Sequence, residues 1–176
     1  MKRLLIVLAL IATAGATMVK PMTVEELTSA SSAIVEGQAV DSWTSWNAQH
    51  TRIYTYTRVK VARALKGNAA ETVVVKEVGG SADGYTQHVA GLQPMSTGER
   101  ALLFLRPSVA ADGTMVIVGL MQGHFRVAKD PQRGATVVSN GVIGAEQLSG
   151  KTVKHYQGSQ LTLSEMETRI RKAVAQ

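Results

Sequence analysis

The sequence predicts a mostly β domain, a small closed barrel with a short helix before it and an amphipathic helix after it. About seven short runs of alternating or continuous apolar residues lie between the two helical patterns, as in small barrels and sandwiches. The strand runs do not alternate with helical ones, which excludes a doubly wound parallel sheet. The run Arg52–Leu65 is long for a sandwich strand and suits one that bends around a small barrel.

The composition is that of a folded protein without cysteine. The chain has 176 residues, of which 45% are hydrophobic and 18% charged, with 19 Lys and Arg against 13 Asp and Glu. This balance is globular and not that of a disordered chain. The lack of cysteine excludes a disulfide scaffold, a thiolate zinc site, a cysteine nucleophile and a lipid-modified N-terminal cysteine.

Residues 1–16 carry the pattern of a signal peptide. Two basic residues precede the apolar run Leu4–Ala12, and Ala14–Ala16 matches the small-residue motif that signal peptidase reads. We expect cleavage to leave residues 17–176 as a single β-barrel domain, secreted or periplasmic, without a membrane anchor. An uncleaved anchor and a buried helix are the alternatives, but a spanning helix needs about 20 apolar residues.

A helix is predicted near each end of the mature chain. Thr23 and Glu26 form a capping-box pattern, in which each side chain bonds the other's backbone amide, so we expect a helix over Val24–Ser31. Ser164 and Glu167 repeat this pattern near the C-terminus. The apolar residues of the second helix recur every four positions, at Met166, Ile170 and Val174. This helix is expected to pack on the sheet, and docking to a partner is the alternative.

The strands are expected between these helices. They are marked by β-branched and aromatic residues with a period of two, or by short unbroken apolar runs. Ala101–Leu105 is apolar throughout, which indicates a central strand, whereas Gly79–Gly84 is expected to be a loop. The predicted strands are Ala33–Val40, Arg52–Leu65, Thr72–Val78, Ala101–Leu105, Thr114–Val118, Phe125–Val127 and Ala135–Val138.

Several stretches, in this order, resemble a known group of domains. They are IVEG at Ile34–Gly37, YTYTRV at Tyr54–Val59, ALKG at Ala64–Gly67, VVV at Val73–Val75 and GERALLFL at Gly98–Leu105. The chain thereby resembles an uncharacterised class of exported bacterial domains, some of them similar to segments beside secreted zinc metalloproteases. More distantly it is similar to netrin-like domains, which include the tissue inhibitors of metalloproteinases.

The resemblance covers about Leu27–Phe125 and implies an OB-like Greek-key barrel of five strands with a helix packed on it. One feature departs from the netrin-like pattern. The inhibitors of that group chelate the protease zinc through an N-terminal cysteine, and this chain has no cysteine. We therefore expect the fold to carry over and the inhibitory chemistry not to.

The sequence contains no recognisable catalytic or metal-binding motif. Its histidines are His50, His88, His124 and His155, and none has the spacing of a helical metalloprotease motif. A Gly-x-Ser-x-Gly elbow is absent, and Gly79–Gly84 lacks the Lys-Ser/Thr of a phosphate loop. We predict no catalytic residue, metal or cofactor and expect a protein that is not an enzyme. An exported hydrolase is the alternative.

Basic and aromatic residues share one face of the long strand. Alternation places Arg52, Tyr54, Tyr56, Arg58 and Lys60 opposite the apolar positions. Three interpretations are open: a solvated face whose charge resists edge pairing, a contact surface for an acidic protein or polysaccharide, and a nucleic-acid surface that stacks bases on the tyrosines. Export makes nucleic acid an unexpected partner.

The two tryptophans, Trp43 and Trp46, fall in the segment Asp41–Thr51, which we expect to be a loop between strands. If exposed, they would anchor a partner. If folded back, they would cap the open end of the barrel. Tyr85 and His88 in a neighbouring loop are companions for a contact role.

These patterns predict an exported, non-enzymatic binding or accessory module of the cell envelope or extracellular space, with a protein or polysaccharide as partner. An exported hydrolase and an OB-like module that binds nucleic acid or another polyanion are the alternatives. The candidate ligand-binding residues are Trp43, Trp46, Tyr54, Tyr56, Arg58, Lys60 and Tyr85.

Overall fold

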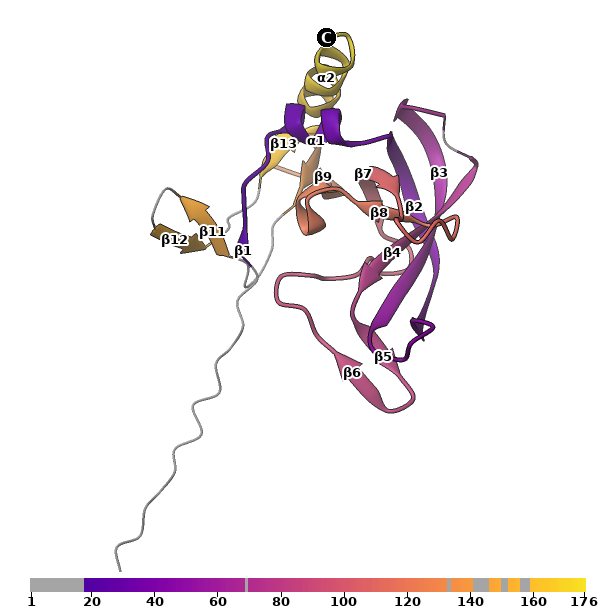
Figure 1. Cartoon of the computed structure of the whole chain (residues 1–176). Helices are drawn as coiled ribbons and strands as arrows, with labels where there is room; N and C mark the ends of the chain where they lie inside the picture. Colours follow the sequence, from indigo (N-terminus) through magenta and orange to yellow (C-terminus); the bar gives the residue numbers. More distant parts are fainter. Residues whose placement is uncertain (1–17, 69, 133, 141–145, 150–151, 156–158) are drawn as a thin grey trace, which may run out of the picture.

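The computed structural model describes residues 18–68, 70–132, 134–140, 146–149, 152–155 and 159–176, and the predicted signal peptide lies outside them. Strands dominate these residues, with a short helix near the N-terminus and a longer one at the C-terminus, which confirms the predicted fold class (Figure 1). In the same part of the chain, no helix has both the length and the apolar character needed to cross a membrane.

Five strands close into a ring. β2 (Ala33–Trp46) pairs with β3 (Ile53–Lys66), β3 pairs with β4 (Thr72–Val78), and β4 pairs with β8 (Met115–Ile117). β8 also pairs with β7 (Arg100–Pro107), and β7 returns to β2. All these pairs are antiparallel except β4–β8, which is parallel. This is the strand order of the expected OB-like Greek-key barrel.

A second layer of sheet branches from β7. One edge of β7 has two partners in succession. Ala101–Leu103 pair with β9 (His124–Asp130), and Leu105–Pro107 pair with β8. β10 (Ala135–Ser139) and β13 (Gln160–Thr162) continue the sheet from β9. The remaining short elements are β1 (Met18–Val19), β5 (Gly80–Ala82), β6 (Tyr85–Gln87), η1 (Leu120–Gly123), β11 (Glu146–Ser149) and β12 (Thr152–His155).

The N-terminal helix α1 (Val24–Ala30) begins with the predicted capping box between Thr23 and Glu26. The C-terminal helix α2 (Leu163–Val174) begins earlier than predicted, because Thr162 and Glu165 form its capping box in place of Ser164 and Glu167. Thr162 is also the last residue of β13, so the chain leaves the sheet and enters the helix at once. The prediction of Ser164 as the cap was therefore wrong. Thr162–Glu165 and Ser164–Glu167 both match the Ser/Thr-x-x-Glu pattern, and the helix uses the first.

The two helices pack together over one end of the sheet (Figure 1). Met166 and Ile170 are fully buried, which confirms their predicted apolar spacing and the packing of α2 on the sheet, whereas Val174 is exposed. Arg169 of α2 donates two hydrogen bonds to Glu25 of α1, at 2.6 and 2.8 Å. The hydrogen bond from Arg169 lowers the pKa of Glu25 to about 2.

Side chains of β7 enter two separate cores. Leu102 and Phe104 pack with the helices on the outside of the barrel, whereas Leu103 and Leu105 pack inside it. All four are completely buried. A strand that is covered on both faces needs apolar residues at every position. This explains the unbroken run Ala101–Leu105 and confirms that it is a central strand.

Two segments predicted as loops are strands instead. β2 does not end at Val40 but continues to Trp46, paired with β3 along its length. Beyond Gln38 the strand has β3 as its only ladder partner among the described strands, so polar residues are tolerated there. Gly79–Gly84 contributes β5, which forms a hairpin with β6. At Gly80 a Cβ atom would lie 2.7 Å from the Thr44 side chain, so glycine lets the hairpin lie against β2.

The dual burial of β7 predicts a large cost for truncating Phe104. Phe104→Ala should lower the free energy of unfolding by about 3–5 kcal/mol, because the truncation leaves a cavity in the core between the barrel and the helices. Val109→Ala, at a side chain that is 94% exposed, should change it by less than about 0.5 kcal/mol. Urea unfolding followed by circular dichroism measures both. Equal, small effects would contradict the assignment of Phe104 to a core.

Candidate ligand-binding surface

A bulge in β2 sets which side chains face outward. Gln38 pairs with Lys60 and Ala39 with Val59, but the next pair is Asp41 with Arg58, so Val40 is an extra residue. Side chains alternate along a strand, and the insertion therefore reverses the direction of every later residue of β2. Trp43 consequently shares the outer face with Tyr56, its partner in the ladder, instead of pointing into the barrel.

Aromatic rings and cations gather on this outer face. Trp43 of β2 lies opposite Tyr56 of β3, and Tyr56 lies opposite Lys76 of β4. The rings of Trp43 and Tyr56 stack nearly parallel, with centroids 5.5 Å apart and planes at 9°. Tyr54 lies next to Tyr56, with ring centroids 6.5 Å apart. We refer to Trp43, Tyr54, Tyr56, Arg58 and Lys76 as the aromatic strip.

Both cations of the strip lie over ring faces. The guanidinium of Arg58 is 5.3 Å from the centroid of Trp43 and bonds Asp41 at 2.8 Å. The ammonium of Lys76 lies 4.5 Å from the centroid of Tyr54. Cations are attracted to the electron-rich faces of aromatic rings. The strip therefore holds two cations at ring level, each also paired with a carboxylate, Arg58 with Asp41 and Lys76 with Asp112.

A carboxylate holds Lys76 in place. Asp112, in the turn before β8, accepts a hydrogen bond from its ammonium at 2.8 Å. This bond raises the pKa of Lys76 and holds the pKa of Asp112 well below its usual range. Both groups are therefore charged at neutral pH.

The structure brings together only part of the predicted site. Trp43, Tyr54, Tyr56 and Arg58 meet in the strip, and Lys60 is exposed on the same face beyond Arg58. The sequence analysis missed Lys76, although alternation in the predicted strand Thr72–Val78 could have placed it beside the tyrosines.

Trp46 and Tyr85 form a separate cluster with His50. Trp46 stacks on His50 and meets the edge of Tyr85, each at 5.7 Å between centroids. Trp46 is half-buried at the end of β2, next to the β5–β6 hairpin, while Tyr85 is 66% exposed. The expectation that both tryptophans lie on a loop is corrected, because both belong to β2. Trp43 lies in the strip, whereas Trp46 lies at the end of β2.

A carboxyl group is buried on the opposite face of β4. Val75 and Glu77 point into the barrel, and Glu77 is only 7% exposed. Its Oε2 atom has no hydrogen-bond partner among the residues that the structure describes. Burial raises the pKa of Glu77 to about 7, against the smaller opposing effects of His124 and the Met95 amide.

Near this group, His124 and Glu99 form a buried pair. The imidazole Nε2 lies 2.8 Å from Glu99 Oε1, which also accepts a hydrogen bond from Arg126 at 3.1 Å. Burial opposes the ionisation of Glu99, but the bond to His124, the Ser96 amide and the charge of Arg126 together lower its pKa to about 2. His124 lines a cavity of about 130 Å³ together with Arg126 and Ser139.

These groups do not assemble a recognisable catalytic or metal centre. Within the described ranges, no hydrogen bond joins Ser139 to His124, and no three His, Cys, Asp or Glu residues are placed to hold a metal ion. Hydrolysis by a serine nucleophile needs that serine within hydrogen-bond reach of its base.

Comparison with known proteins adds no relationship. No protein-family model matches the chain, and no curated protein matches it.

Because the carboxyl of Glu77 is buried, we expect Glu77→Gln to raise the free energy of unfolding by an amount that depends on pH. Between pH 4.5 and about 7 the folded state keeps a proton that the unfolded state has released, so wild-type stability falls as pH rises through that window. The amide does not titrate, and the stability advantage of the variant should therefore grow by about 3 kcal/mol between pH 4 and pH 8.

Urea titrations at several pH values measure this difference. The control is Lys76→Gln, on the outward face of the same strand, whose effect should stay constant between pH 5 and 8. A pH-independent difference for Glu77→Gln would show that the carboxyl is solvated in the folded protein.

Proposed function

We propose that the protein is an exported, non-catalytic module that binds an acidic polysaccharide on the aromatic strip. The observation that carries this proposal is the continuous row of Trp43, Tyr56 and Tyr54 with cations at ring level. Trp43 remains 38% exposed in this row, so its ring offers a sugar ring apolar contact area. OB-type barrels use the outer face of neighbouring strands to bind oligosaccharides and oligonucleotides.

The charge on this face favours an acidic ligand. The stretch Arg52–Lys66 contains no acidic residue. Arg52 and Lys60 are exposed at either end of the β3 contribution to the strip. Arg58 and Lys76 are positioned by Asp41 and Asp112, so their orientation is set before a ligand arrives. In an acidic polysaccharide, the sugar rings would contact the aromatic rings and the carboxylates would contact the neighbouring cations.

An acidic protein is the competing partner for the same surface. Trp, Tyr and Arg are the residues most enriched at protein-binding hot spots, and the strip contains all three types. The row of rings across neighbouring strands favours the polysaccharide, because a repeating polymer presents repeating ring faces. The predicted export of the chain agrees with a polysaccharide of the envelope or the extracellular space.

A second candidate, an exported hydrolase, is favoured by the buried His124–Glu99 pair. A histidine oriented by a carboxylate is the usual arrangement of a general base. The cavity beside His124 is small, about 130 Å³. For this reason we prefer the binding function of the strip to a hydrolase. Turnover of any ester, amide or glycoside that disappears in His124→Asn would establish the hydrolase and contradict a non-catalytic module.

Truncation of the strip should abolish polysaccharide binding without unfolding the protein. In affinity electrophoresis through gels that contain polygalacturonate, Trp43→Ala should raise the dissociation constant about thirtyfold. Tyr56→Ala should raise it about tenfold, because each variant removes one ring of the stacked pair.

Tyr85→Ala is the matched control, since it removes an exposed ring that lies outside the strip. Its affinity should equal that of the wild type, and circular dichroism should confirm that all the variants are folded. Unchanged retardation of Trp43→Ala, or equal retardation of the wild type by neutral dextran, would rule out the proposal. Tighter, steeply salt-dependent binding to single-stranded DNA would assign the strip to nucleic acid instead.

A further inference from the structure

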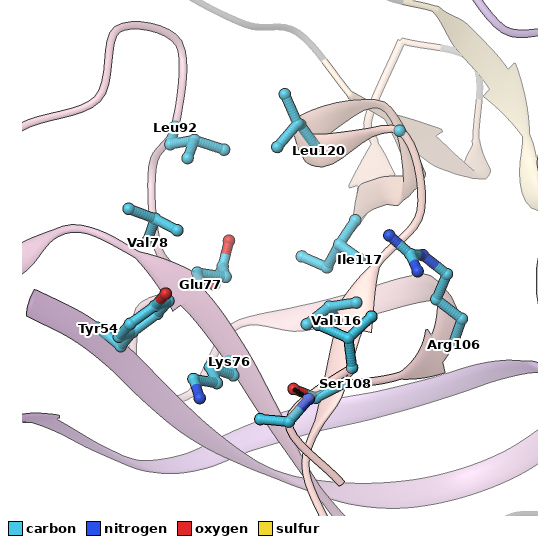
Figure 2. Close-up of a pocket in the computed structure, with 13 residues that line it drawn as sticks. Tyr54, Lys76, Glu77, Val78, Leu92, Arg106, Ser108, Val116, Ile117 and Leu120 are labelled. Atoms are coloured by element: carbon cyan, nitrogen blue, oxygen red, sulfur yellow. Dashed lines mark hydrogen bonds between the residues drawn. The ribbon is translucent and has the colours of Figure 1, made fainter. Parts of the chain in front are cut away.

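The barrel has an opening at one seam. β4 and β8 form a single ladder pair, Val75 with Met115. Beyond it the two strands diverge, and a cavity of about 480 Å³ lies between Lys76–Val78 on one side and Val116–Leu120 on the other (Figure 2). This volume is within the range of small-molecule sites in proteins, about 300–1,000 Å³.

Apolar side chains form most of the cavity wall. They come from β4, from the chain before β7, from β8 and from η1: Val78, Leu92, Val116, Ile117 and Leu120. Figure 2 shows Leu92 and Leu120 facing each other across the space. Such a wall favours an apolar ligand body over water.

Two large apolar residues at this cavity are exposed without covering anything. Leu120 is 47% exposed and Val109 is 94% exposed. Leu120 also has a backbone φ of 60°, directly after Gly119 with φ 68°. A left-handed conformation is unfavourable for leucine, so the fold accepts local strain that keeps this side chain at the cavity.

The cavity is also lined by polar residues, namely Tyr54, Lys76, Arg106, Ser108 and Glu77, and of these Glu77 is the most deeply buried. Figure 2 shows its carboxyl directed into the space below Leu92 and Leu120. The side chain is more than nine-tenths buried, and no donor among the described residues reaches its Oε2 atom. Buried polar atoms are nearly always hydrogen-bonded. An unused acceptor that faces an apolar cavity is the arrangement that a ligand with one hydrogen-bond donor would complete.

We propose that this seam binds a small amphipathic molecule whose aliphatic or aromatic body fills the apolar cavity and whose hydroxyl or amine group donates a hydrogen bond to Glu77. The cavity shares Tyr54 and Lys76 with the aromatic strip. Glu77 and Leu120 lie outside the strip, so substitutions at these two residues test this site separately from Trp43→Ala. The two proposals can therefore fail independently.

A matched pair of probes tests the donor requirement. 1-Octanol and 2-octanone have the same number of carbons, but only the alcohol donates a hydrogen bond. Binding is followed by chemical-shift titration of the full mature chain at pH 8.5, above the pKa of Glu77, where the carboxylate only accepts. The wild type should bind the alcohol about tenfold more tightly than the ketone.

Two variants separate the roles of the carboxyl and the wall. Glu77→Gln should bind both probes within about threefold of each other, because an amide both donates and accepts. Leu120→Gly removes part of the wall and relieves the left-handed strain, so it should stay folded and bind both probes about tenfold more weakly. Val174→Ser, at an exposed apolar residue of α2, is the control and should bind like the wild type.

The shifts that accompany binding should fall on the residues around the seam, above all Val78, Leu92 and Ile117. No shift change up to the solubility limit of 1-octanol would overturn the proposal. The same preference for the alcohol in Glu77→Gln as in the wild type, or undiminished binding by Leu120→Gly, would overturn it as well.

Discussion

The fold depends on the burial of β7 on both faces. One face of this strand completes the barrel core, and the other supports the helices. Its two edges hold β2 on one side and β8 and β9 on the other. Ion pairs connect the same parts. The buried Glu36 of β2 accepts hydrogen bonds from the partly exposed Arg63 and Arg100, and Arg63 also reaches Glu167 of α2. The barrel and its helical cover are thus one cooperative unit.

Both candidate sites arise where the barrel departs from regular pairing. The bulge at Val40 turns Trp43 outward and completes the aromatic strip. The single ladder pair between β4 and β8 leaves the seam open beside Glu77. Consecutive residues of β4 serve the two places, since Lys76 points out to the rings and Glu77 points into the barrel. Regular strand alternation therefore directs these two side chains to opposite faces of β4.

Local signals in the sequence were sufficient for much of the fold. Period-two alternation located β3, and the capping box located α1, because both depend on near neighbours. The path of β2 beyond Val40 was missed, because its mostly polar residues form a strand through pairing with β3 and not through an apolar alternation of their own. Three of the five strip residues followed from alternation in β3. Trp43 and Lys76 join them through cross-strand register, which a single sequence does not specify. The sequence also held a sign of the buried carboxyl, because Glu77 alternates with Val73 and Val75 on the apolar face of its strand.

Ring closure also determines how the chain can reach its native state. β2 must find β7, and β4 must find β8, across long intervening stretches of sequence. Contacts of this kind require loop-closure entropy to be lost before they stabilise the fold, and such topologies fold over about milliseconds to seconds. Because β8 ends at Ile117, a nascent or translocating chain cannot complete its barrel until that residue has emerged. Until then β4 and β7 lack β8, their shared partner in the ring, and the chain is open to capture by chaperones.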